Sequence, residues 1–253
     1  MPALPAALLA RPIAHRGLHD PAAGVIENSP TAFARAIAAG YGIELDLQLS
    51  ADGVAMVFHD DKLDRLTHQN GPLRARTAAD LGQIVLAGAA AGDRIPTLAQ
   101  VLDQVAGQVP LLIELKDQSA GTGAGATDLE QAVARTLAGY RGDVAVMSFN
   151  PAMMAAMADL APALPRGITS CDFAPDDWPG VSAETCAALR DIDRFEAVGA
   201  SFISHDWQDL ARPRVVELRA RGVPVLCWTV KSPAAEAIAR QGADQITFEG
   251  YLA

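Results

Sequence analysis

The sequence has little positive charge, few cysteines and no long hydrophobic run, and each shortage excludes a class of protein. Lys and Arg total 20 against 30 Asp and Glu, which gives a formal net charge of −10. Because a broad nucleic-acid-binding surface is normally basic, we expect no nucleic acid partner. A small anionic substrate stays compatible with this charge where local cations or a metal ion oppose the global field.

The three cysteines, Cys171, Cys186 and Cys227, form no CxxC pair. A sparse, odd number does not indicate a disulfide framework, so we expect small buried side chains in a protein of the reducing cytoplasm. The apolar runs are too short to cross a bilayer, and we expect no stable membrane insertion. The apolar start lacks a basic n-region, so we expect it to lead into a first strand rather than to act as a signal peptide.

Half of the residues are hydrophobic and 20% are charged, which is enough apolar material for a substantial core. The chain repeats a short apolar run, a loop, an alanine-rich stretch and a glycine. Helix-capping Ser, Thr or Asp and terminal Gly predict helices over 29–40, 97–107, 128–139, 151–161, 182–192, 212–222 and 232–242. The apolar runs predict strands over 12–17, 42–49, 110–116, 143–149, 165–170, 200–205, 223–230 and 244–250.

Strands that alternate with helices imply parallel strands with right-handed crossovers. Eight such units across 1–253 predict a single (β/α)₈ barrel, with a doubly wound open sheet as the alternative. The rhythm breaks once, because the run at 54–58 continues or pairs with the second strand. An insertion of about 60–94, with a short helix within 76–88, follows it. The glycine-rich stretch 119–127 fits neither common phosphate-binding glycine pattern, so we give it no phosphate role.

Acidic side chains lie on two of the expected strands. Glu44 and Asp46 are two residues apart and therefore point the same way, into the barrel, while Leu45 faces the helices. Glu114 alternates with Ile113 in the same manner on the next strand. Active sites of such barrels lie at the carboxyl ends of the strands. Three carboxylates converging there form a hard-oxygen site that suits one Mg²⁺ or Ca²⁺ better than Zn²⁺.

Cations and imidazoles follow the same strands. The alternative to a metal site is that the acids form structural ion pairs with Arg16 and Lys116. His15 and His59 flank the carboxylates and can exchange protons near neutral pH. Phosphodiester cleavage needs a base, an acid and positive charge on the phosphate oxygens. Arg16 offers a guanidinium fork for phosphate and Lys116 a point charge, so the set is complete for that chemistry.

Other polar or aromatic candidates carry less information. Trp228, near the end of the seventh strand, either walls the site or packs in the core. We expect His19 and His68 to lie in loops away from the substrate, whereas His205 ends the sixth strand and is a candidate to line the pocket. The sequence has no Gly-x-Ser-x-Gly elbow, and its serines lack the context of a catalytic triad.

Taken together, these residues resemble the glycerophosphodiester phosphodiesterase family. The resemblance runs in family order and implies a (β/α)₈ barrel with a small insertion after the second strand. The matching pieces are "AHRG" (14–17), Glu27-Asn28 with the hydroxyl residue Ser29, "ELDLQLSADGVAMVFHDDKLDRLT" (44–67), "IPTLAQVL" (95–102), "LLIELK" (111–116) and "VLCWTV" (225–230).

The resemblance implies hydrolysis of a small-molecule glycerophosphodiester to sn-glycerol 3-phosphate and an alcohol, with one divalent ion, Mg²⁺ or Ca²⁺. Two alternatives stay open: a phospholipase D-like or lysolipid phosphodiesterase, and a non-catalytic module that binds a phosphate metabolite. The expected site comprises catalytic His15 and His59, phosphate-binding Arg16 and Lys116, Trp228 beside the substrate, supporting Glu27 and Asn28, and the metal ligands Glu44, Asp46 and Glu114.

The chain departs from the family pattern at a few positions. Ile26 replaces the usual Pro, and Ser29 replaces Thr. Lys231 stands where Asn commonly follows Trp-Thr-Val, and "ITFEGY" (246–251) replaces a segment that resembles Thr-Asp-Tyr-Pro. Lys231 and this last segment belong to the expected rim, so we expect them to affect the choice of substrate rather than the chemistry.

Overall fold

Eight parallel strands form a closed barrel in this computed structural model, which describes residues 2–118 and 128–253. The strand β1 pairs with both β2 and β9, which closes the ring, so the barrel expectation is confirmed and the open-sheet alternative is wrong. The parallel strands are β1 Ile13–Ala14, β2 Gly42–Leu49, β4 Leu111–Leu115, β5 Val144–Ser148, β6 Arg166–Ser170, β7 Phe202–Asp206, β8 Val225–Val230 and β9 Gln245–Phe248.

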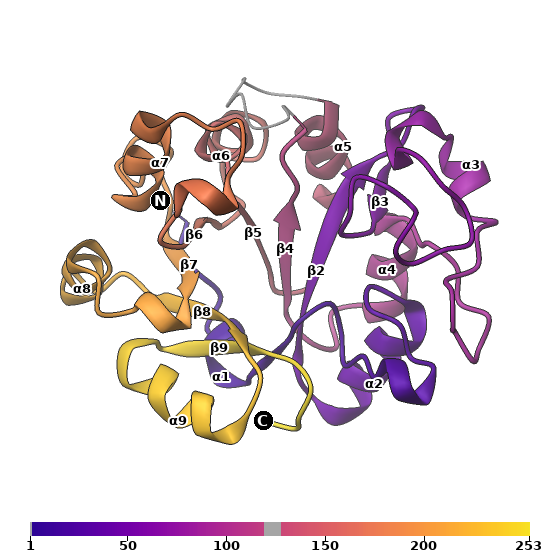
Figure 1. The fold of residues 1–253 in the computed structure, drawn as a ribbon, viewed down its shortest axis with the longest axis horizontal. Coiled ribbons are helices and arrows are strands. Elements are labelled where there is room, and N and C mark those ends of the chain that lie inside the picture. Colours follow the sequence, from indigo (N-terminus) through magenta and orange to yellow (C-terminus); the bar gives the residue numbers. More distant parts are fainter. Residues whose placement is uncertain (1, 119–127) are drawn as a thin grey trace.

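A ninth strand, β3 (Ala55–Val57), lies antiparallel to the carboxyl half of β2. Leu47 faces Val57 in this pairing. The expected hairpin partner of the second strand is therefore present. This strand β3 lies at the end of the sheet, next to β2, and is not part of the ring of eight parallel strands (Figure 1).

Helices surround the strands, and the seven predicted helices are present to within two residues at each end (Figure 1). Side chains at several helix starts accept backbone N–H groups as expected; Thr97 forms a complete capping box with Gln100. The helices are α1 Ala7–Ala10, α2 Pro30–Ala39, α3 Ala78–Leu81, α4 Leu98–Val105, α5 Asp128–Leu137, α6 Pro151–Leu160, α7 Ala183–Arg190, α8 Pro213–Ala220 and α9 Pro233–Gly242, with short 3₁₀ turns at Pro21–Ala23, Leu73–Ala75, Pro175–Asp177 and Trp207–Asp209.

The apolar start leads into the first strand, as expected, through the short helix α1. Its residue Leu8 is fully buried and packs in one cluster with Ile13, Leu112 and Phe202, which come from three strands of the barrel. Gly167 on β6 makes room for that cluster, because a Cβ there would lie 2.4 Å from the ring of Phe202. This apolar cluster thus fills part of the barrel interior, and the inward-pointing polar residues lie at other positions along the strands.

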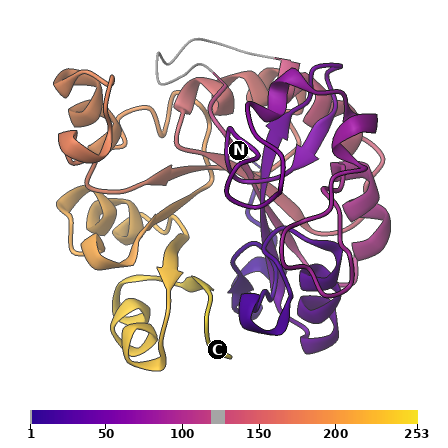
Figure 2. The same ribbon diagram turned by 45° about the vertical axis from the view of Figure 1, so that its right-hand side comes forward.

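The outer faces of the strands pack against the helices. Ile43, Leu45 and Leu47 of β2 belong to this outer core, as the alternation of the sequence predicts. The segment between β3 and α4 packs around a separate cluster that includes Met56, Phe58, Leu63, Leu73 and Leu81, and lies at one side of the barrel (Figures 1 and 2).

Several simpler expectations can also be checked. The cysteines are buried and free, as predicted. Among the residues that the structure describes, no helix has the length and apolarity needed to span a bilayer. The glycine-rich stretch 119–127, for which we expected no phosphate role, lies outside the described residues.

Candidate active site

The chain turns sharply where β1 ends. The first strand was expected to run to residue 17, but it stops at Ala14 because the next residues leave the extended conformation. Arg16 and Gly17 have φ angles of +54° and +80°, and a non-glycine residue rarely adopts such a value. A Cβ on Gly17 would lie 2.9 Å from the Cβ of Ala32, so only glycine fits. This turn places the side chains of His15 and Arg16 at the carboxyl end of the barrel.

The three expected carboxylates converge. Glu44 and Asp46 lie on β2, Glu114 lies on β4, and the strand register places Asp46 opposite Glu114. All three residues are buried, with exposed fractions of 1%, 1% and 7%. One carboxylate oxygen from each lies within 4.8 Å of the others. The spatial convergence that the sequence predicts is therefore found.

Two cations compensate this cluster in part. The Lys116 ammonium lies 2.8 Å from Oδ1 of Asp46 and also pairs with Glu114, and Nε of Arg16 lies 3.2 Å from Oδ2 of Asp46. Glu44 accepts the backbone N–H of Arg16 at 2.9 Å, and Nε2 of His15 is 4.0 Å from the same carboxylate oxygen. The ion pairs of the alternative interpretation thus exist, but they supply two cations to three carboxylates.

This imbalance shows in the pKa values. Burial, followed by repulsion from Asp46 and Glu114, raises the pKa of Glu44 well above its usual value. Burial also raises the pKa of Glu114, although Lys116 opposes the effect. Burial alone would raise the pKa of Asp46, but Lys116, His59 and Arg16 outweigh it and hold that pKa far below its usual range.

A divalent ion fits this site. Three carboxylate oxygens at one point are the ligands that Mg²⁺ and Ca²⁺ prefer, and both ions commonly complete their coordination with water or substrate oxygens. The raised pKa of Glu44 shows that its ionised form lacks a compensating cation, which such an ion would supply.

Glu27 and Asn28 hold the cluster from the loop before α2. The Arg16 guanidinium donates to Glu27 at 2.7 Å, and the same carboxylate receives two hydrogen bonds from Arg65. The Asn28 amide donates to Oδ2 of Asp46 at 2.8 Å and accepts the backbone N–H of Asp46 at 3.3 Å. Asn28 has a φ angle of +54°, a strained conformation that Asn tolerates better than most residues.

His59 follows β3, and its main-chain carbonyl accepts a hydrogen bond from Gln48 at 3.0 Å. Its Nδ1 lies 2.6 Å from Oδ1 of Asp60, which also receives two hydrogen bonds from Arg65. Burial, followed by the positive charge of Lys116, lowers the pKa of His59. The imidazole is thus held from one side by a carboxylate.

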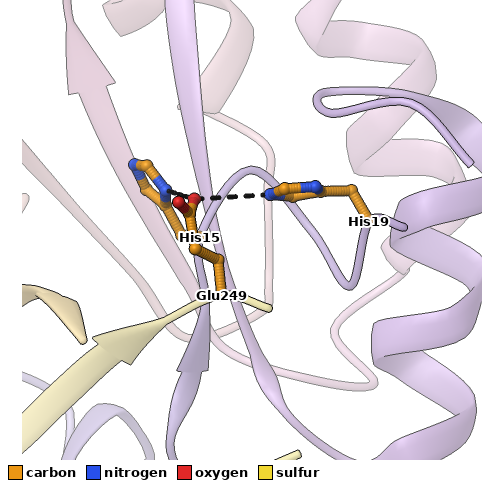
Figure 3. Close-up of side chains that lie close together, drawn as sticks. All are labelled: His15, His19 and Glu249. Carbon is orange, nitrogen blue, oxygen red and sulfur yellow. Dashed lines mark hydrogen bonds and ion pairs between the residues drawn. The ribbon is translucent and has the colours of Figure 1, made fainter. Parts of the chain in front are cut away.

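His15 is held in a similar way. Its Nδ1 lies 2.6 Å from Oε2 of Glu249, a residue that directly follows β9, and burial lowers the pKa of His15 although this hydrogen bond opposes the effect. His19 lies in a loop, as expected, and its Nε2 lies 3.5 Å from the same Glu249 oxygen (Figure 3).

Trp228 and His205 have different positions. The Trp228 indole donates to the carbonyl of Ser204 at 3.0 Å and lies 5.4 Å from Phe149, centroid to centroid, as part of an aromatic group that is only partly covered. His205 is fully buried, and its ring contacts Ser170 and Asp209, so the suggestion that it lines the pocket was wrong.

Three residues of this site were missed in the sequence, namely Asp60, Arg65 and Glu249. Glu249 could have been found, because it directly follows the last apolar run and the last strand of a closed barrel lies beside the first. Asp60 adjoins a candidate histidine. Arg65 has no comparable signal, because it lies in a long irregular segment whose path the sequence pattern does not define.

Comparison with known proteins decides the family. The model of the glycerophosphoryl diester phosphodiesterase family matches residues 15–248, which includes every expected site residue. The chain belongs to this family. The expected family and enzyme class are therefore confirmed.

Relatives agree with this assignment. A glycerophosphodiester phosphodiesterase of Bacillus subtilis (strain 168) is 29% identical over 213 residues, covering 76% of this chain and 67% of that protein. The structure of a glycerophosphodiester phosphodiesterase from Agrobacterium tumefaciens is 25% identical, with a TM-score of 0.69 over 94% of this chain and 95% of that one. The fold is also shared with an Oleispira antarctica phosphodiesterase in complex with the product sn-glycerol-3-phosphate, with a TM-score of 0.75, 24% identity and coverage of 94% and 92%.

Proposed function

We propose that this chain hydrolyses glycerophosphodiesters to sn-glycerol 3-phosphate and an alcohol, with a divalent metal ion and histidine acid–base catalysis. The observation that carries the proposal is the buried trio Glu44, Asp46 and Glu114, with His15 within 4.0 Å of Glu44. Family membership and the product named for the Oleispira antarctica structure support the same reaction class. We expect the protein to act in the reducing cytoplasm, where free, buried cysteines such as these are common.

Glu44, Asp46 and Glu114 would hold the ion. A bound Mg²⁺ or Ca²⁺ supplies Lewis-acid polarisation of the phosphate and neutralises charge that develops on its oxygens. Arg16 and Lys116 add fixed positive charge beside the carboxylates. Each carries more N–H donors than its present partners use, so both can also donate to a phosphate oxygen.

His15 and His59 would move the protons. In each ring Nδ1 lies 2.6 Å from a carboxylate, which leaves Nε2 for the substrate. One imidazole takes the proton of the attacking hydroxyl, and the other gives a proton to the oxygen of the leaving alcohol. Burial is the first cause that lowers the pKa of both rings. The imidazole that acts as the acid must carry a proton on Nε2 as well as on Nδ1, whereas the one that acts as the base must have Nε2 free of a proton.

The experiment is an assay of sn-glycerol 3-phosphate release from a panel of glycerophosphodiesters, run with Mg²⁺, with Ca²⁺ and with excess chelator. We expect turnover that needs the ion and that falls by about 10²- to 10⁴-fold in His59→Ala. Undiminished activity with chelator or in His59→Ala would overturn the mechanism. Tight binding of these diesters, measured by calorimetry without product release, would instead identify a non-catalytic binding module.

One observation favours a second substrate class. A mainly apolar cavity of about 350 Å³ is lined by Phe149, Trp178, Val181 and Leu189, and it also contacts Asp117, the residue after Lys116. A cavity of this kind beside the carboxyl ends of the strands could take the acyl chain of a lysolipid. Faster hydrolysis of long-chain lysolipids than of water-soluble diesters would select this candidate; the reverse order would exclude it.

A further inference from the structure

Glu249 receives three cationic or donor groups at the carboxyl end of β9. Its Oε2 lies 2.6 Å from Nδ1 of His15 and 3.5 Å from Nε2 of His19, and its Oε1 lies 2.7 Å from the Lys231 ammonium. The two imidazoles lie on opposite sides of the carboxylate (Figure 3). These contacts join β9 to the turn after β1 and to the residue that follows β8.

His15, His19 and Glu249 could in principle share a metal ion. The distances favour a hydrogen bond instead. Two ligands about 2.1 Å from one ion at right angles lie about 3 Å apart, which is longer than the 2.6 Å between His15 and Glu249. The Lys231 ammonium also occupies the other oxygen of the carboxylate and would repel an added cation.

The hydrogen bond fixes the tautomer of His15. An ionised carboxylate only accepts, so Nδ1 of His15 carries the proton and the lone pair resides on Nε2. That Nε2 lies 4.0 Å from Oε2 of Glu44, one of the three clustered carboxylates. The carboxylate of Glu249 therefore selects which ring nitrogen faces the cluster and in which form.

We propose that Glu249 is a positioning residue, which orients His15 through Nδ1 and is itself held in place by Lys231 and His19. The inference rests on the proposed function, because it assigns a task to His15 in that reaction. It also gives a role to Lys231 and to the "ITFEGY" segment, the two departures from the family pattern at the rim.

The second imidazole has a parallel arrangement. Asp60 contacts Nδ1 of His59 at 2.6 Å and is held by Arg65, as Glu249 contacts His15 and is held by Lys231. The hydrogen bond from His15, followed by the nearby His19 imidazole, keeps the pKa of Glu249 far below its usual range, so the carboxylate stays ionised. Removing a carboxylate that orients a metal-bound imidazole typically costs about 10- to 100-fold in activity, and we expect an effect of the same order for this proton-transferring imidazole.

The test compares Glu249→Met, which removes the acceptor, with Glu249→Gln, whose amide oxygen can still accept. Glu236→Met is the matched control, because Glu236 also pairs with a cation and a ring hydroxyl, Arg240 and Tyr251, without contacting His15. His15→Ala tests the proposed function and assigns the ring signals of His15. The readouts are kcat and KM for sn-glycerol 3-phosphate release, and the imidazole ¹⁵N spectrum of the metal-free protein at pH 8.

We expect Glu249→Met to lower kcat by about 10- to 100-fold with KM changed by less than about threefold, and to convert His15 from the Nδ1–H tautomer to a mixture. Glu249→Gln should retain more of both properties, and Glu236→Met should match the parent chain.

An unchanged kcat or an unchanged His15 tautomer in both Glu249 variants, with His15→Ala inactive, would overturn the positioning role alone. Full activity in His15→Ala would instead overturn the proposed function. If Glu249→Met does not fold, Glu249→Ala, which also removes the acceptor, decides the question by the same two readouts.

Discussion

At the scale of single residues, the site has two features. The cations near the three carboxylates do not fully balance their negative charge, and each of the two imidazoles is held by a further carboxylate. Glu44 illustrates the first condition, since its pKa is raised by burial and by its acidic neighbours. His59 illustrates the second, with Asp60 at 2.6 Å from Nδ1. Each condition predicts a measurable effect of a single substitution.

His59→Ala should lower kcat for sn-glycerol 3-phosphate release by about 10²- to 10⁴-fold, because a positioned acid or base contributes that much. His68→Ala is the control, since His68 is exposed in the same segment of the chain. Melting temperatures of both variants check that folding is intact. Equal rates for His59→Ala and His68→Ala would exclude His59 from proton transfer.

Glu44→Gln should stabilise the metal-free protein. A carboxyl whose pKa is raised by folding contributes stability at low pH that is lost as pH rises through the folded-state pKa, so Glu44 contributes less to stability at pH 7 to 8 than at low pH. Replacing it with an isosteric amide should raise the free energy of unfolding by about 1 kcal/mol, or the melting temperature by roughly 2–4 °C.

The control for this change is Glu184→Gln, an exposed carboxyl in α7 that should leave stability unchanged. The stabilisation of Glu44→Gln should also disappear below about pH 4, where both states of the parent chain are protonated. A less stable Glu44→Gln at pH 8 without metal would contradict the charge imbalance.

Asp60 gives a pH dependence of opposite sign. Burial alone would raise its pKa, but hydrogen bonds from Arg65 and His59 lower it to about 2. The stability that this carboxylate contributes is therefore present above its unfolded pKa of about 3.9 and is lost as pH falls toward about 2. Arg65→Gln should raise the pKa of Asp60 in carboxyl NMR titrations.

In urea unfolding, the deficit of Arg65→Gln relative to the parent chain should be greatest at neutral pH and should narrow between about pH 4 and pH 2. Arg94→Gln, which removes a guanidinium that donates to Gln83, serves as the control. A deficit that stays constant across this range would show that Arg65 does not stabilise the ionised form of Asp60.

At the scale of elements, β2 and β1 differ in how far the sequence defines them. In β2 the apolar positions alternate strictly with Glu44 and Asp46, and a strand has only two faces, so the side chains that enter the barrel could be predicted. The end of β1 could not, because Arg16 adopts a left-handed conformation that its residue type does not favour. Contacts with α2 and β2 hold Arg16 in this conformation, and a local sequence pattern cannot reveal such contacts.

Gly17→Ala should therefore destabilise the protein by roughly 1–3 kcal/mol and also lower activity. Its φ is +80°, and the added Cβ would lie 2.9 Å from Ala32 and 3.0 Å from Phe33. Gly53→Ala is the matched control, because Gly53 has a φ of +77° with no atom within 4 Å of the added Cβ. Thermal unfolding of the two variants separates the clash from the backbone strain that they share.

A loss of stability in Gly17→Ala no greater than in Gly53→Ala would contradict a close contact between this turn and α2. A larger loss should be accompanied by lower kcat, because displacement of the turn moves both His15 and Arg16.

At the scale of the whole molecule, the eight strands of the ring and the helices between them could be predicted, but the contacts made at closure could not. Repetition in the sequence indicates eight units, and a barrel is one of two ways to arrange them. Closure brings Glu249 to His15 across 234 positions of the chain. Whether a side chain there reaches the imidazole depends on its length and on the register of β1 with β9, which sequence periodicity does not define.

The proposed metal site also has a consequence for the entire fold. Its ligands come from two neighbouring strands of the ring, so an ion that binds only the folded state should stabilise the whole protein. We expect Mg²⁺ or Ca²⁺ to raise the melting temperature in a concentration-dependent way. The increase should vanish in Glu114→Gln, and an equal increase in that variant would place the bound ion elsewhere.

Metal-dependent catalysis by the carboxylate cluster is tested most directly by titrating the metal-free protein with Mg²⁺ or Ca²⁺ while sn-glycerol 3-phosphate release from glycerophosphocholine is followed. Activity should be absent at the start, rise to saturation as the ion is added, and stay absent throughout the same titration of Glu114→Gln. Full activity of the metal-free parent chain, or saturation of Glu114→Gln at the parent level and ion concentration, would contradict a role for these carboxylates in holding the ion that the reaction needs.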